Sequence, residues 1–392
     1  MKTYNVCAVT STRADYGLLR SLLLKLECEQ QITLSVIVTG THLLKDFGYT
    51  KKEILADNYK NIIDIKILAD QDDKAGMALA TSECMKKFAD YFASNVPDLL
   101  VVLGDRFEIF GAVSAAHMMG IKIAHISGGD VTEGAIDDAL RHSMTKMSMI
   151  HFPGCEQSAK RIIQMGEEPE RVFNVGEPGV ENCLNMTLYN RDALAENLVF
   201  KNILSDYAVV TFHPVTREED TAEFQVRELI RAMDNFLNMS YIITLANVDA
   251  GGRLINDIWL EEVKKHKNWF VTPSLGMLRY LSAIKYAKLV IGNSSSGIVE
   301  APAIGTPTVN IGDRQKGRMM ADSVICCEPV FEKIVSAINK GLSKEMQDVA
   351  KNIKSPLGDG TTSSKILNVI IDYLKKDNIS NKKKFYDIDF KI

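Results

Sequence analysis

Residues 289–318 read LVIGNSSSGIVEAPAIGTPTVNIGDRQKGR, with two short apolar runs on either side of a serine-rich turn. The apolar run 289–291 is typical of a buried parallel strand, and the turn 292–297 leads into a helix-forming segment at 298–304. Proline and glycine end that segment early, and residues 308–311 start a second apolar strand. The sequence therefore predicts a short helix between two strands, at the edge of the sheet where α/β proteins bind ligands.

The serine-rich turn is a candidate phosphate site. The first N–H groups of a helix have no partner within the helix, and they lie at the positive end of its dipole. The small residues Gly292, Ser294 and Ser295 would let an anion approach these groups closely. Glu300 follows and could accept hydrogen bonds from sugar hydroxyls, while Arg314 approaches from the next loop. An ordinary N-cap explains the serines equally well, and the short helix between two strands favours the ligand site.

The composition is that of an ordinary globular protein. The 392 residues are 46% hydrophobic and 24% charged, so the chain is long enough for two domains with separate cores. No apolar run reaches the roughly 18 residues of a membrane span, and the N-terminus lacks an apolar signal region, which favours a cytoplasmic protein without a membrane partner. The net charge of -4 predicts no nucleic-acid partner. The seven cysteines have no metal-binding spacing, so we expect reduced thiols and no metal site.

Strand-like and helical segments alternate along the whole chain. This alternation predicts a doubly wound parallel sheet, and its repetition in the second half predicts two Rossmann-like domains of an α/β protein. The expected strands lie at 6–9, 34–38, 99–103, 121–126 and 150–152, and then at 209–212, 242–245, 269–272, 289–291 and 308–311. Three regions follow from this pattern: a first Rossmann-like domain over 1–176, a second over 177–360, and a C-terminal helix and tail over 361–392 that we expect to pack back on the first domain. The turn-rich segment 175–197 is the expected linker.

Ligands of such sheets bind beyond the carboxyl ends of the strands, so the polar residues that follow each apolar run are the candidates. The first strand is followed by Thr10-Ser11-Thr12-Arg13, without the G-x-G-x-x-G pattern of a dinucleotide cofactor. Arg13 at a helix start can donate a fork of hydrogen bonds to a diphosphate. A surface arginine paired with Asp15 is an equally ordinary interpretation.

Three aspartates after the third and fourth strands form the densest group of acids. Asp105 follows one strand, and Asp130 and Asp137 lie in the segment after the next. Adjacent parallel strands lie only about 5 Å apart, so these acids should share one site and raise one another's proton affinity. Such a site suits proton transfer near neutral pH. Asp130 can be interpreted instead as a turn residue, and Asp137 as an acid at the N-terminus of a helix. Asp105, at the end of a strand, has little structural explanation.

His213 follows the first strand of the second half, in the segment Phe212-His213-Pro214. A histidine at the carboxyl end of a strand, facing the acids of the first domain, can donate a proton or bind a phosphate. A histidine that only caps the strand end is an equally good interpretation.

Five motifs carry a family resemblance. They are GDRFE (104–108), HISGGDVTEGAIDDALRHS (125–143), FHPVT (212–216), GNSSSGIVEAP (292–302) and NIGDRQKGR (310–318). Together and in this order they resemble the hydrolysing UDP-N-acetylglucosamine 2-epimerases, which begin the synthesis of sialic and related nonulosonic acids. The resemblance implies a glycosyltransferase-B architecture, chemistry without a metal or cofactor, a UDP-sugar substrate, and N-acetylmannosamine plus UDP as products. It also implies a homodimer or homotetramer.

The same resemblance assigns roles to particular residues. Arg13, Ser294, Ser295 and Glu300 would hold UDP, and Asp105, Asp137 and His213 would serve chemistry. Ser127 departs from the pattern, because well-known members of the family have a glutamate there. A shorter, neutral residue at this position could suit UDP-2,4-diacetamido-2,4,6-trideoxyglucose, a precursor of legionaminic acid. If Asp130 supplies the missing charge instead, UDP-N-acetylglucosamine remains the substrate, and we narrowly favour that sugar from the sequence.

The chemistry that the resemblance implies is loss of UDP from C1 and a proton from C2 to give a glycal, followed by addition of water. These steps need a base, an acid and a clamp on the leaving diphosphate. A nonhydrolysing epimerase and a glycosyltransferase would share the fold and the nucleotide site. The three acids are more than simple glycosyl transfer requires, which argues against a glycosyltransferase. Only the resemblance of the motifs favours a hydrolysing over a nonhydrolysing epimerase.

Overall fold

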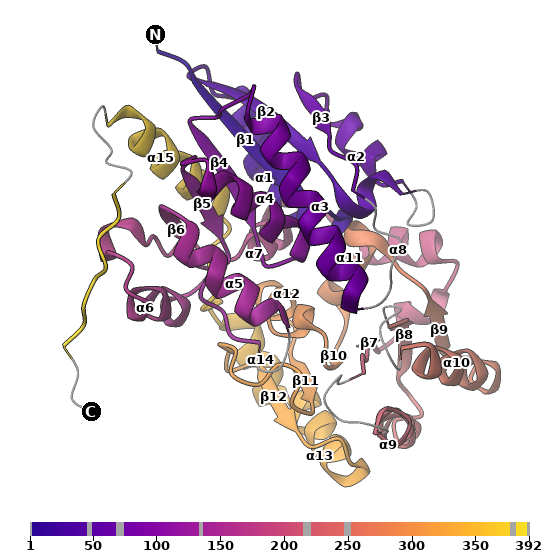
Figure 1. Ribbon diagram of the computed structural model, residues 1–392. Helices are drawn as coiled ribbons and strands as arrows, with labels where there is room; N and C mark the ends of the chain where they lie inside the picture. The colour runs from indigo at the N-terminus through magenta and orange to yellow at the C-terminus, as the bar shows by residue number, and fades with distance from the viewer. Residues whose placement is uncertain are drawn as a thin grey trace. The chain divides into compact units, whose positions relative to one another are not determined.

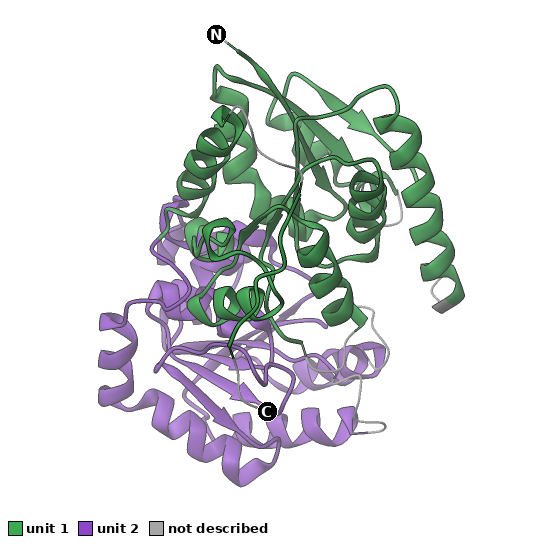
Figure 2. Ribbon diagram, turned by 60° about the vertical axis from the view of Figure 1, so that its left-hand side comes forward, with its two compact units in different colours: residues 1–182, 360–392 green, residues 183–359 purple. Residues whose placement is uncertain are grey.

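The computed structural model describes residues 2–44, 49–67, 74–132, 136–214, 221–246, 252–376 and 382–389. The chain divides into two compact units, Met1–Asn182 with Gly360–Ile392 and Cys183–Asp359. Figure 2 colours these units green and purple. Each unit is built on its own parallel sheet of six strands, and each has its own hydrophobic core.

The sheet of the first unit has the strand order β3-β2-β1-β4-β5-β6. Its strands are β1 (Tyr4–Thr10), β2 (Ile32–Val38), β3 (Ile62–Asp64), β4 (Leu99–Leu103), β5 (Ile123–Ile126) and β6 (Ile150–Phe152). All neighbouring pairs are parallel, and central β4, LLVVL, is buried along its whole length. The direction of winding reverses between β1 and β4, so the carboxyl ends of these strands flank the switch point where such sheets bind ligands.

Helices cover both faces of this sheet (Figure 1). The helical segments are α1 (Arg13–Cys28), η1 (Gly40–Leu43), α2 (Lys51–Ala56), α3 (Lys74–Phe92), α4 (Phe107–Met118), α5 (Ile136–Met147), α6 (Glu156–Gln164), η2 (Pro169–Arg171), α7 (Pro178–Asn185) and α15 (Thr362–Lys375). One core cluster joins the sheet to α1 and α15, through residues such as Leu23 and Ile370, and another joins it to α3 and α4, through residues such as Phe88. The C-terminal helix thus belongs to the core of the first unit.

The sheet of the second unit has the order β12-β11-β10-β7-β8-β9. Its strands are β7 (Tyr207–Thr211), β8 (Ser240–Thr244), β9 (Trp269–Thr272), β10 (Leu289–Gly292), β11 (Thr308–Ile311) and β12 (Val324–Cys327). Its helical segments are α8 (Arg191–Leu198), η3 (Lys201–Leu204), α9 (Ala222–Asp234), α10 (Gly252–Glu262), η4 (Val263–Lys265), α11 (Gly276–Tyr286), η5 (Ser295–Gly297), α12 (Glu300–Ile304), α13 (Phe331–Leu342) and α14 (Lys344–Asn352). The switch point here lies between β10 and β7, which are paired in register.

Gly292 ends β10 in a conformation that only glycine adopts readily, with φ at 133°. A Cβ at this position would lie 2.0 Å from the carbonyl oxygen of Thr211 on neighbouring β7. A side chain would therefore push the two central strands apart at their carboxyl ends.

Three local predictions differ from the structure. The boundary between the two units, at Asn182 and Cys183, falls within the expected linker 175–197, but most of that segment is helical and forms α7 and α8. Its Pro178 starts α7, where a missing N–H costs nothing, and Asn190 caps α8 by accepting from the N–H of Ala193 at 2.8 Å. The helix expected at 298–304 begins two residues later, as the five-residue α12, and a 3-10 turn, η5, precedes it at Ser295–Gly297. Strands β3 and β12 are additional to those expected, and both are short edge strands whose residues are mostly partly exposed.

None of the helices in the described parts of the chain is long and apolar enough to cross a membrane. All seven cysteines are free thiols.

Candidate functional site

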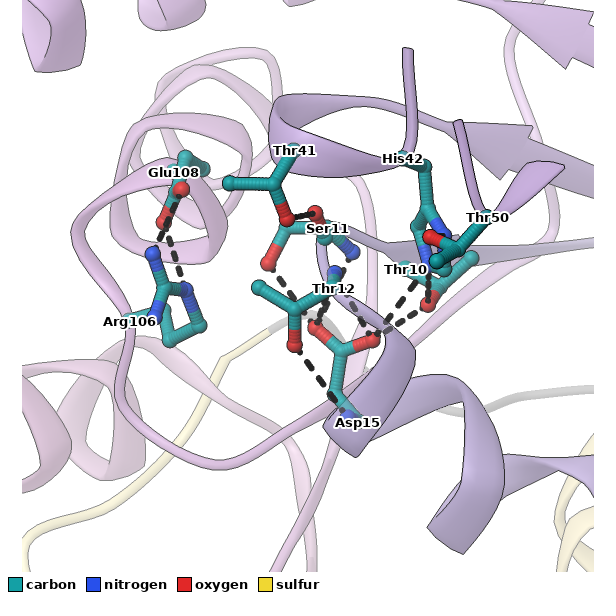
Figure 3. Close-up of polar contacts among 9 residues, drawn as sticks. All are labelled: Thr10, Ser11, Thr12, Asp15, Thr41, His42, Thr50, Arg106 and Glu108. Carbon is teal, nitrogen blue, oxygen red and sulfur yellow. Dashed lines mark hydrogen bonds and ion pairs between the residues drawn. The ribbon is translucent and has the colours of Figure 1, made fainter. Parts of the chain in front are cut away.

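At the carboxyl end of β1, Asp15 fixes the loop that leads into α1 (Figure 3). Its carboxylate accepts hydrogen bonds from the N–H of Ser11 at 3.0 Å, the hydroxyl of Ser11 at 2.8 Å and the N–H of Thr12 at 3.1 Å. The hydroxyl of Thr10 also donates to it. Asp15 is thus occupied by its own loop, and Arg13 stands exposed at the first position of α1.

His42 is a structural member of the same network. Its Nε2 lies 3.0 Å from the hydroxyl of Thr10, and its Nδ1 lies 2.7 Å from the hydroxyl of Thr50. Burial lowers the pKa of His42, although Asp15 partly opposes that shift. With both ring nitrogens engaged, this histidine ties the carboxyl ends of β1 and β2 together.

At the end of the next strand, β4, the partly exposed Arg106 makes an ion pair with the buried Glu108. Arg106 donates to the two oxygens of Glu108 from Nε at 3.0 Å and from Nη2 at 2.9 Å, and Glu108 is only 1% exposed. Desolvation lowers the pKa of Arg106, but the carboxylates of Glu108, Asp15 and Asp137 outweigh it and raise that pKa. The guanidinium therefore lies within the electrostatic reach of both Asp15 and Asp137.

Arg141 on α5 joins the two segments that carry the predicted acids. Its Nη2 makes an ion pair with Asp105 and donates to the hydroxyl of Thr132 at 3.1 Å. Its Nη1 donates to the backbone carbonyl of Asp130 at 2.8 Å. Because Arg141 is buried, these contacts fix the tip of β4 against the loop that follows β5.

Asp137 lies at the start of α5, beside this ion pair. Its side chain is at the surface, yet desolvation by the surrounding protein raises its pKa, and the charge of Asp105 raises it further. Arg141 and Arg106 oppose the shift without cancelling it. Asp137 thus holds its proton to a higher pH than an ordinary aspartate, which is a property of groups that transfer protons.

Asp130 is brought to the same loop, but its carboxylate has another partner. Its Oδ1 accepts a hydrogen bond from the hydroxyl of Ser158 on α6 at 2.5 Å. Of the three predicted acids, Asp105 and Asp137 therefore interact electrostatically, whereas the side chain of Asp130 ties its loop to α6.

In the second unit, Asn293 holds the tip of β7. Its amide oxygen accepts from the N–H of His213 at 2.7 Å, and its amide nitrogen donates to the carbonyl of His213 at 2.8 Å. The carbonyl of Asn293 accepts in turn from Arg314 at 3.1 Å and from Gln315 at 2.9 Å. The loops after β7, β10 and β11 are thereby joined.

The imidazole of His213 is buried and neutral. Burial lowers its pKa to about 4, and the positive charge of Arg314 acts in the same direction. Its Nδ1 finds no hydrogen-bond partner among the residues that the structure describes. Buried polar atoms are rarely left unsatisfied, so this nitrogen is a candidate contact for a ligand.

The serine turn lies directly after Gly292. Ser294 is the N-cap of η5, and its hydroxyl accepts from the N–H of Ser296 at 3.4 Å. Ser296 also bonds Tyr280, while Ser295 is exposed. Glu300 starts α12, and burial raises the pKa of its carboxyl, against the opposing charge of Arg318.

The structure thus gathers the predicted residues at two strand edges, with Asp105, Asp130, Asp137 and Arg13 in the first unit and Gly292, His213, Ser294, Ser295, Glu300 and Arg314 in the second. Sequence reasoning missed the roles of Arg141 and Asn293. Arg141 is signalled only by its position three residues after Asp138, one helical turn along α5. In the described parts of the chain, no cluster of three or more histidines, cysteines or carboxylates is arranged to hold a metal ion.

A family model described as UDP-N-acetylglucosamine 2-epimerase matches residues 24–371 of the chain. The chain is 38% identical over 383 residues to a Campylobacter jejuni protein named GDP/UDP-N,N'-diacetylbacillosamine 2-epimerase (hydrolyzing), with 97% of this chain and 99% of that protein covered. It is 37% identical over 381 residues to polysialic acid biosynthesis protein P7 of Escherichia coli, with coverage of 97% and 96%. A UDP-N,N'-diacetylbacillosamine 2-epimerase (hydrolyzing) of Legionella pneumophila is 32% identical over 377 residues, with coverage of 95% and 97%.

Solved structures share the fold. A putative UDP-N-acetylglucosamine 2-epimerase of Listeria monocytogenes superposes with a TM-score of 0.83 at 19% identity, and both chains are covered completely, at 100%. The UDP-GlcNAc 2-epimerase of Neisseria meningitidis, solved with UDP-GlcNAc bound, has a TM-score of 0.80 at 18% identity, with 94% of this chain and 100% of that chain covered. The predicted class, two Rossmann-like domains of the glycosyltransferase-B kind, is confirmed. By the match of its sequence to the family model and to these relatives, the chain belongs to the UDP-N-acetylglucosamine 2-epimerase family.

Proposed function

We propose that this chain is a hydrolysing 2-epimerase that acts on a UDP-linked 2-acetamido sugar. A base removes the proton from C2 while the bond from C1 to the diphosphate oxygen breaks, so UDP leaves with the electron pair and a glycal remains. Water then adds its hydroxyl at C1, and a proton returns to the opposite face of C2. The products are UDP and the free sugar, epimerised at C2.

The observation that carries this proposal is the pairing of unlike carboxyl groups in the first unit. Elimination needs a carboxylate that takes a proton, and hydration needs a carboxylic acid that gives one. Asp105, ion-paired with Arg141, is the candidate base. Asp137, whose pKa is raised by partial desolvation and by the charge of Asp105, is the candidate acid. Two neighbouring carboxyl groups in different environments are the usual means of dividing these tasks.

The second unit supplies the candidate UDP site. Ser294, Ser295 and the flanking Gly292 offer hydroxyl and backbone donors to a diphosphate, and Arg314 adds a positive charge. Glu300 is proposed to accept hydrogen bonds from the ribose hydroxyls. We propose that Arg13 adds a further donor fork to the diphosphate.

In the free protein His213 is a neutral imidazole, because its pKa is about 4. Its Nδ1, which lacks a partner among the described residues, would bond the leaving diphosphate. Asp130 is proposed to hold the loop that carries Asp137, through Ser158, rather than to carry a proton itself.

For the sugar, we propose UDP-2,4-diacetamido-2,4,6-trideoxyglucose, which is UDP-N,N'-diacetylbacillosamine. Two relatives, 38% and 32% identical, are named for this sugar, and Ser127 leaves more room than a glutamate would. These observations outweigh the narrow preference for UDP-N-acetylglucosamine that the sequence alone supports. UDP-N-acetylglucosamine is the rival, since a relative from Neisseria meningitidis at 30% identity is named for it.

The test is an incubation with each UDP-sugar in D₂O, followed by NMR. Release of UDP together with a free sugar that is inverted and deuterated at C2 is the expected result. UDP release that requires an added acceptor would indicate a glycosyltransferase, and deuterated UDP-sugar without UDP release would indicate a nonhydrolysing epimerase. Hydrolysis without deuterium at C2 would refute proton transfer at that carbon.

A further inference from the structure

Tyr280 on α11 is joined to the serine turn through its hydroxyl. The phenol hydrogen-bonds the hydroxyl of Ser296 in η5, and the hydroxyl of Ser296 donates in turn to the oxygen of Ser294 at 3.3 Å. The N–H of Ser296 donates to the same oxygen at 3.4 Å. Three hydroxyl groups, one from α11 and two from the turn, therefore form a chain that ends at Ser294, one of the two serines proposed to bind the diphosphate.

The number of protons fixes the direction of this chain. A serine, threonine or tyrosine hydroxyl has one proton to donate. Ser296 gives its proton to Ser294, so the proton between Tyr280 and Ser296 comes from Tyr280. Burial raises the pKa of the Tyr280 phenol, against its hydrogen bonds with Ser296 and Thr211, so the phenol keeps its proton at neutral pH. Thr211 is then a donor to the phenol oxygen.

The chain leaves the proton of Ser294 for a ligand. The Ser294 oxygen accepts twice from Ser296, and its own proton has no acceptor in the parts of the chain that the structure describes. Because hydrogen-bonded hydroxyls polarise one another, an anion that accepts from Ser294 would strengthen the two bonds that precede it in the chain. A donor whose other contacts are already made needs little rearrangement when negative charge arrives.

The backbone of the turn is held by the sheet. The hydroxyl of Thr308 on β11 donates to the carbonyl of Gly297 at 2.6 Å, at the end of η5. A Cβ at Gly297 would lie 2.8 Å from the Cγ2 of Thr308, so a larger residue would separate the turn from the strand. On the other side, Tyr280 packs against the apolar cluster that includes Leu275 and Ala301. With both sides fixed, the Tyr280 hydroxyl is left to orient the hydroxyls of the turn.

We propose that Tyr280 is a positioning residue of the diphosphate site, which acts through Ser296 to keep the Ser294 hydroxyl as a donor to the diphosphate. This inference rests on the proposed function and adds to it a residue that does not touch the ligand. Each hydroxyl keeps its own proton and orients the next one, so no proton is transferred along the chain.

The test measures binding of UDP and of uridine to the wild type, Tyr280→Phe, Ser296→Ala and the double variant, with calorimetry for UDP and ligand-observed NMR for uridine. Each single variant should weaken UDP binding about threefold to tenfold, as expected for the loss of one hydrogen bond. The double variant should bind UDP no more than about twofold more weakly than Ser296→Ala, because the Tyr280 hydroxyl acts only through Ser296. Uridine, which lacks the diphosphate, should bind all four proteins equally.

Tyr207→Phe is the matched control. Tyr207 is a buried tyrosine whose hydroxyl also bonds α11, since it donates to the carbonyl of Ala283 at 2.7 Å. It is the first residue of β7, at the opposite end of that strand from the serine turn. Tyr207→Phe should keep the wild-type affinity for UDP even if it melts earlier. If Tyr280→Phe does not fold, Ser296→Ala carries the test, and it must weaken the binding of UDP without weakening that of uridine.

Unchanged UDP affinity in Tyr280→Phe would overturn the inference. A loss that persists in the Ser296→Ala background would also overturn it, because the phenol would then contact the ligand itself. An equal loss for uridine would do the same, because Tyr280 would then act on the nucleoside or on the fold.

The proposed function fails separately. If UDP binds and the variants behave as expected, but neither UDP-sugar is turned over, the inference stands and the hydrolysing epimerase does not. A wild type that does not bind UDP would overturn the inference whatever its turnover, because Tyr280 would then have no diphosphate contact to support.

Discussion

The side-chain amide of Asn293 hydrogen-bonds to both backbone groups of His213: its oxygen lies 2.7 Å from the backbone nitrogen, and its nitrogen lies 2.8 Å from the carbonyl oxygen. A side chain from the tip of β10 thereby replaces the strand pairing that ends at Thr211 and Gly292. The backbone of His213 is consequently fixed before any ligand arrives, which lowers the entropic cost of binding.

The first prediction concerns these two hydrogen bonds. Asn293→Ala should weaken UDP binding by about tenfold to a hundredfold, because each buried backbone group that loses its partner costs about 1–3 kcal/mol and the loop would rearrange. Calorimetry with UDP measures the loss. Asn268→Ala is the control, because Asn268 bonds the carbonyl of Met239 at 2.7 Å at the amino end of the same sheet. Equal UDP affinity in Asn293→Ala and the wild type would contradict the prediction.

The second prediction concerns Glu300. Glu300→Ala should reduce UDP affinity, since a hydrogen bond to a charged group contributes about 1.5–3 kcal/mol. Because burial raises the pKa of this carboxyl, wild-type affinity should also fall as the pH drops through that raised value, and the variant should lack this dependence. The exposed Glu345 provides the control variant Glu345→Ala. Calorimetry that finds the same affinity and pH dependence in Glu300→Ala would reject Glu300 as a UDP ligand.

The third prediction concerns the candidate base. Asp105→Asn should abolish turnover and leave UDP affinity nearly intact, because the amide keeps the shape of the side chain but cannot accept a proton. The measurement is UDP release, together with calorimetry. Asp98→Asn is matched to it, since Asp98 lies at the amino end of β4 and accepts from the N–H of Asn5 at 2.8 Å. Wild-type turnover in Asp105→Asn would reject Asp105 as a base.

How far the sequence predicts this site depends on how local each signal is. A buried strand ends where apolar residues give way to polar ones, so Asp105, His213 and Gly292 could be located from the sequence alone. Their partners could not. Arg141 lies 36 residues from Asp105, and Asn293 lies 80 residues from His213. Such pairs depend on which helix or loop returns over which strand tip, which no local pattern specifies.

The contact made by Glu177 is also not predictable from the local sequence. The Gly-Glu-Pro-Gly segment around it has the composition of a linker, and the sequence was interpreted that way. In the structure the proline starts α7, and the glutamate bonds Ser127, which is 50 residues away. A turn-rich composition thus predicts where the backbone bends without predicting where a side chain reaches.

The fourth prediction concerns the candidate acid. Asp137 should titrate above the ordinary aspartate pKa of about 3.9, because partial desolvation and the charge of Asp105 both raise its pKa. In Asp105→Asn the second cause is absent, so the pKa of Asp137 should fall. Carbon NMR of labelled aspartate carboxyls, assigned with Asp137→Asn, measures both values. An unchanged pKa in Asp105→Asn would mean that the two groups do not interact.

The sign of the effect on stability follows from the same shift. Since the pKa of Asp137 is higher in the folded protein than in the unfolded chain, the folded state binds more protons between the two values. This contribution is present at low pH and is lost as the pH rises through the folded pKa. Asp137→Asn should therefore flatten the pH dependence of the unfolding free energy in that window.

The fifth prediction concerns His213, whose pKa of about 4 in the free protein leaves it neutral at pH 6. If its imidazole contacts the diphosphate of UDP, the negative charge should raise that pKa, and binding should draw a proton from solution. UDP affinity would then increase as the pH falls from 7 toward the pKa of the complex. UDP itself also titrates near this pH, because the second pKa of a phosphate is about 6, and it can therefore exchange protons on binding. For this reason the wild type and the variant are compared with the same ligand at the same pH. Calorimetry at pH 6, in buffers that differ in ionisation enthalpy, gives the number of protons taken up. His213→Gln retains a hydrogen-bonding side chain but cannot be protonated, and it should take up fewer protons than the wild type with the same UDP. Equal proton uptake by the two proteins would place His213 away from the diphosphate and would leave its neutral imidazole with a purely structural role.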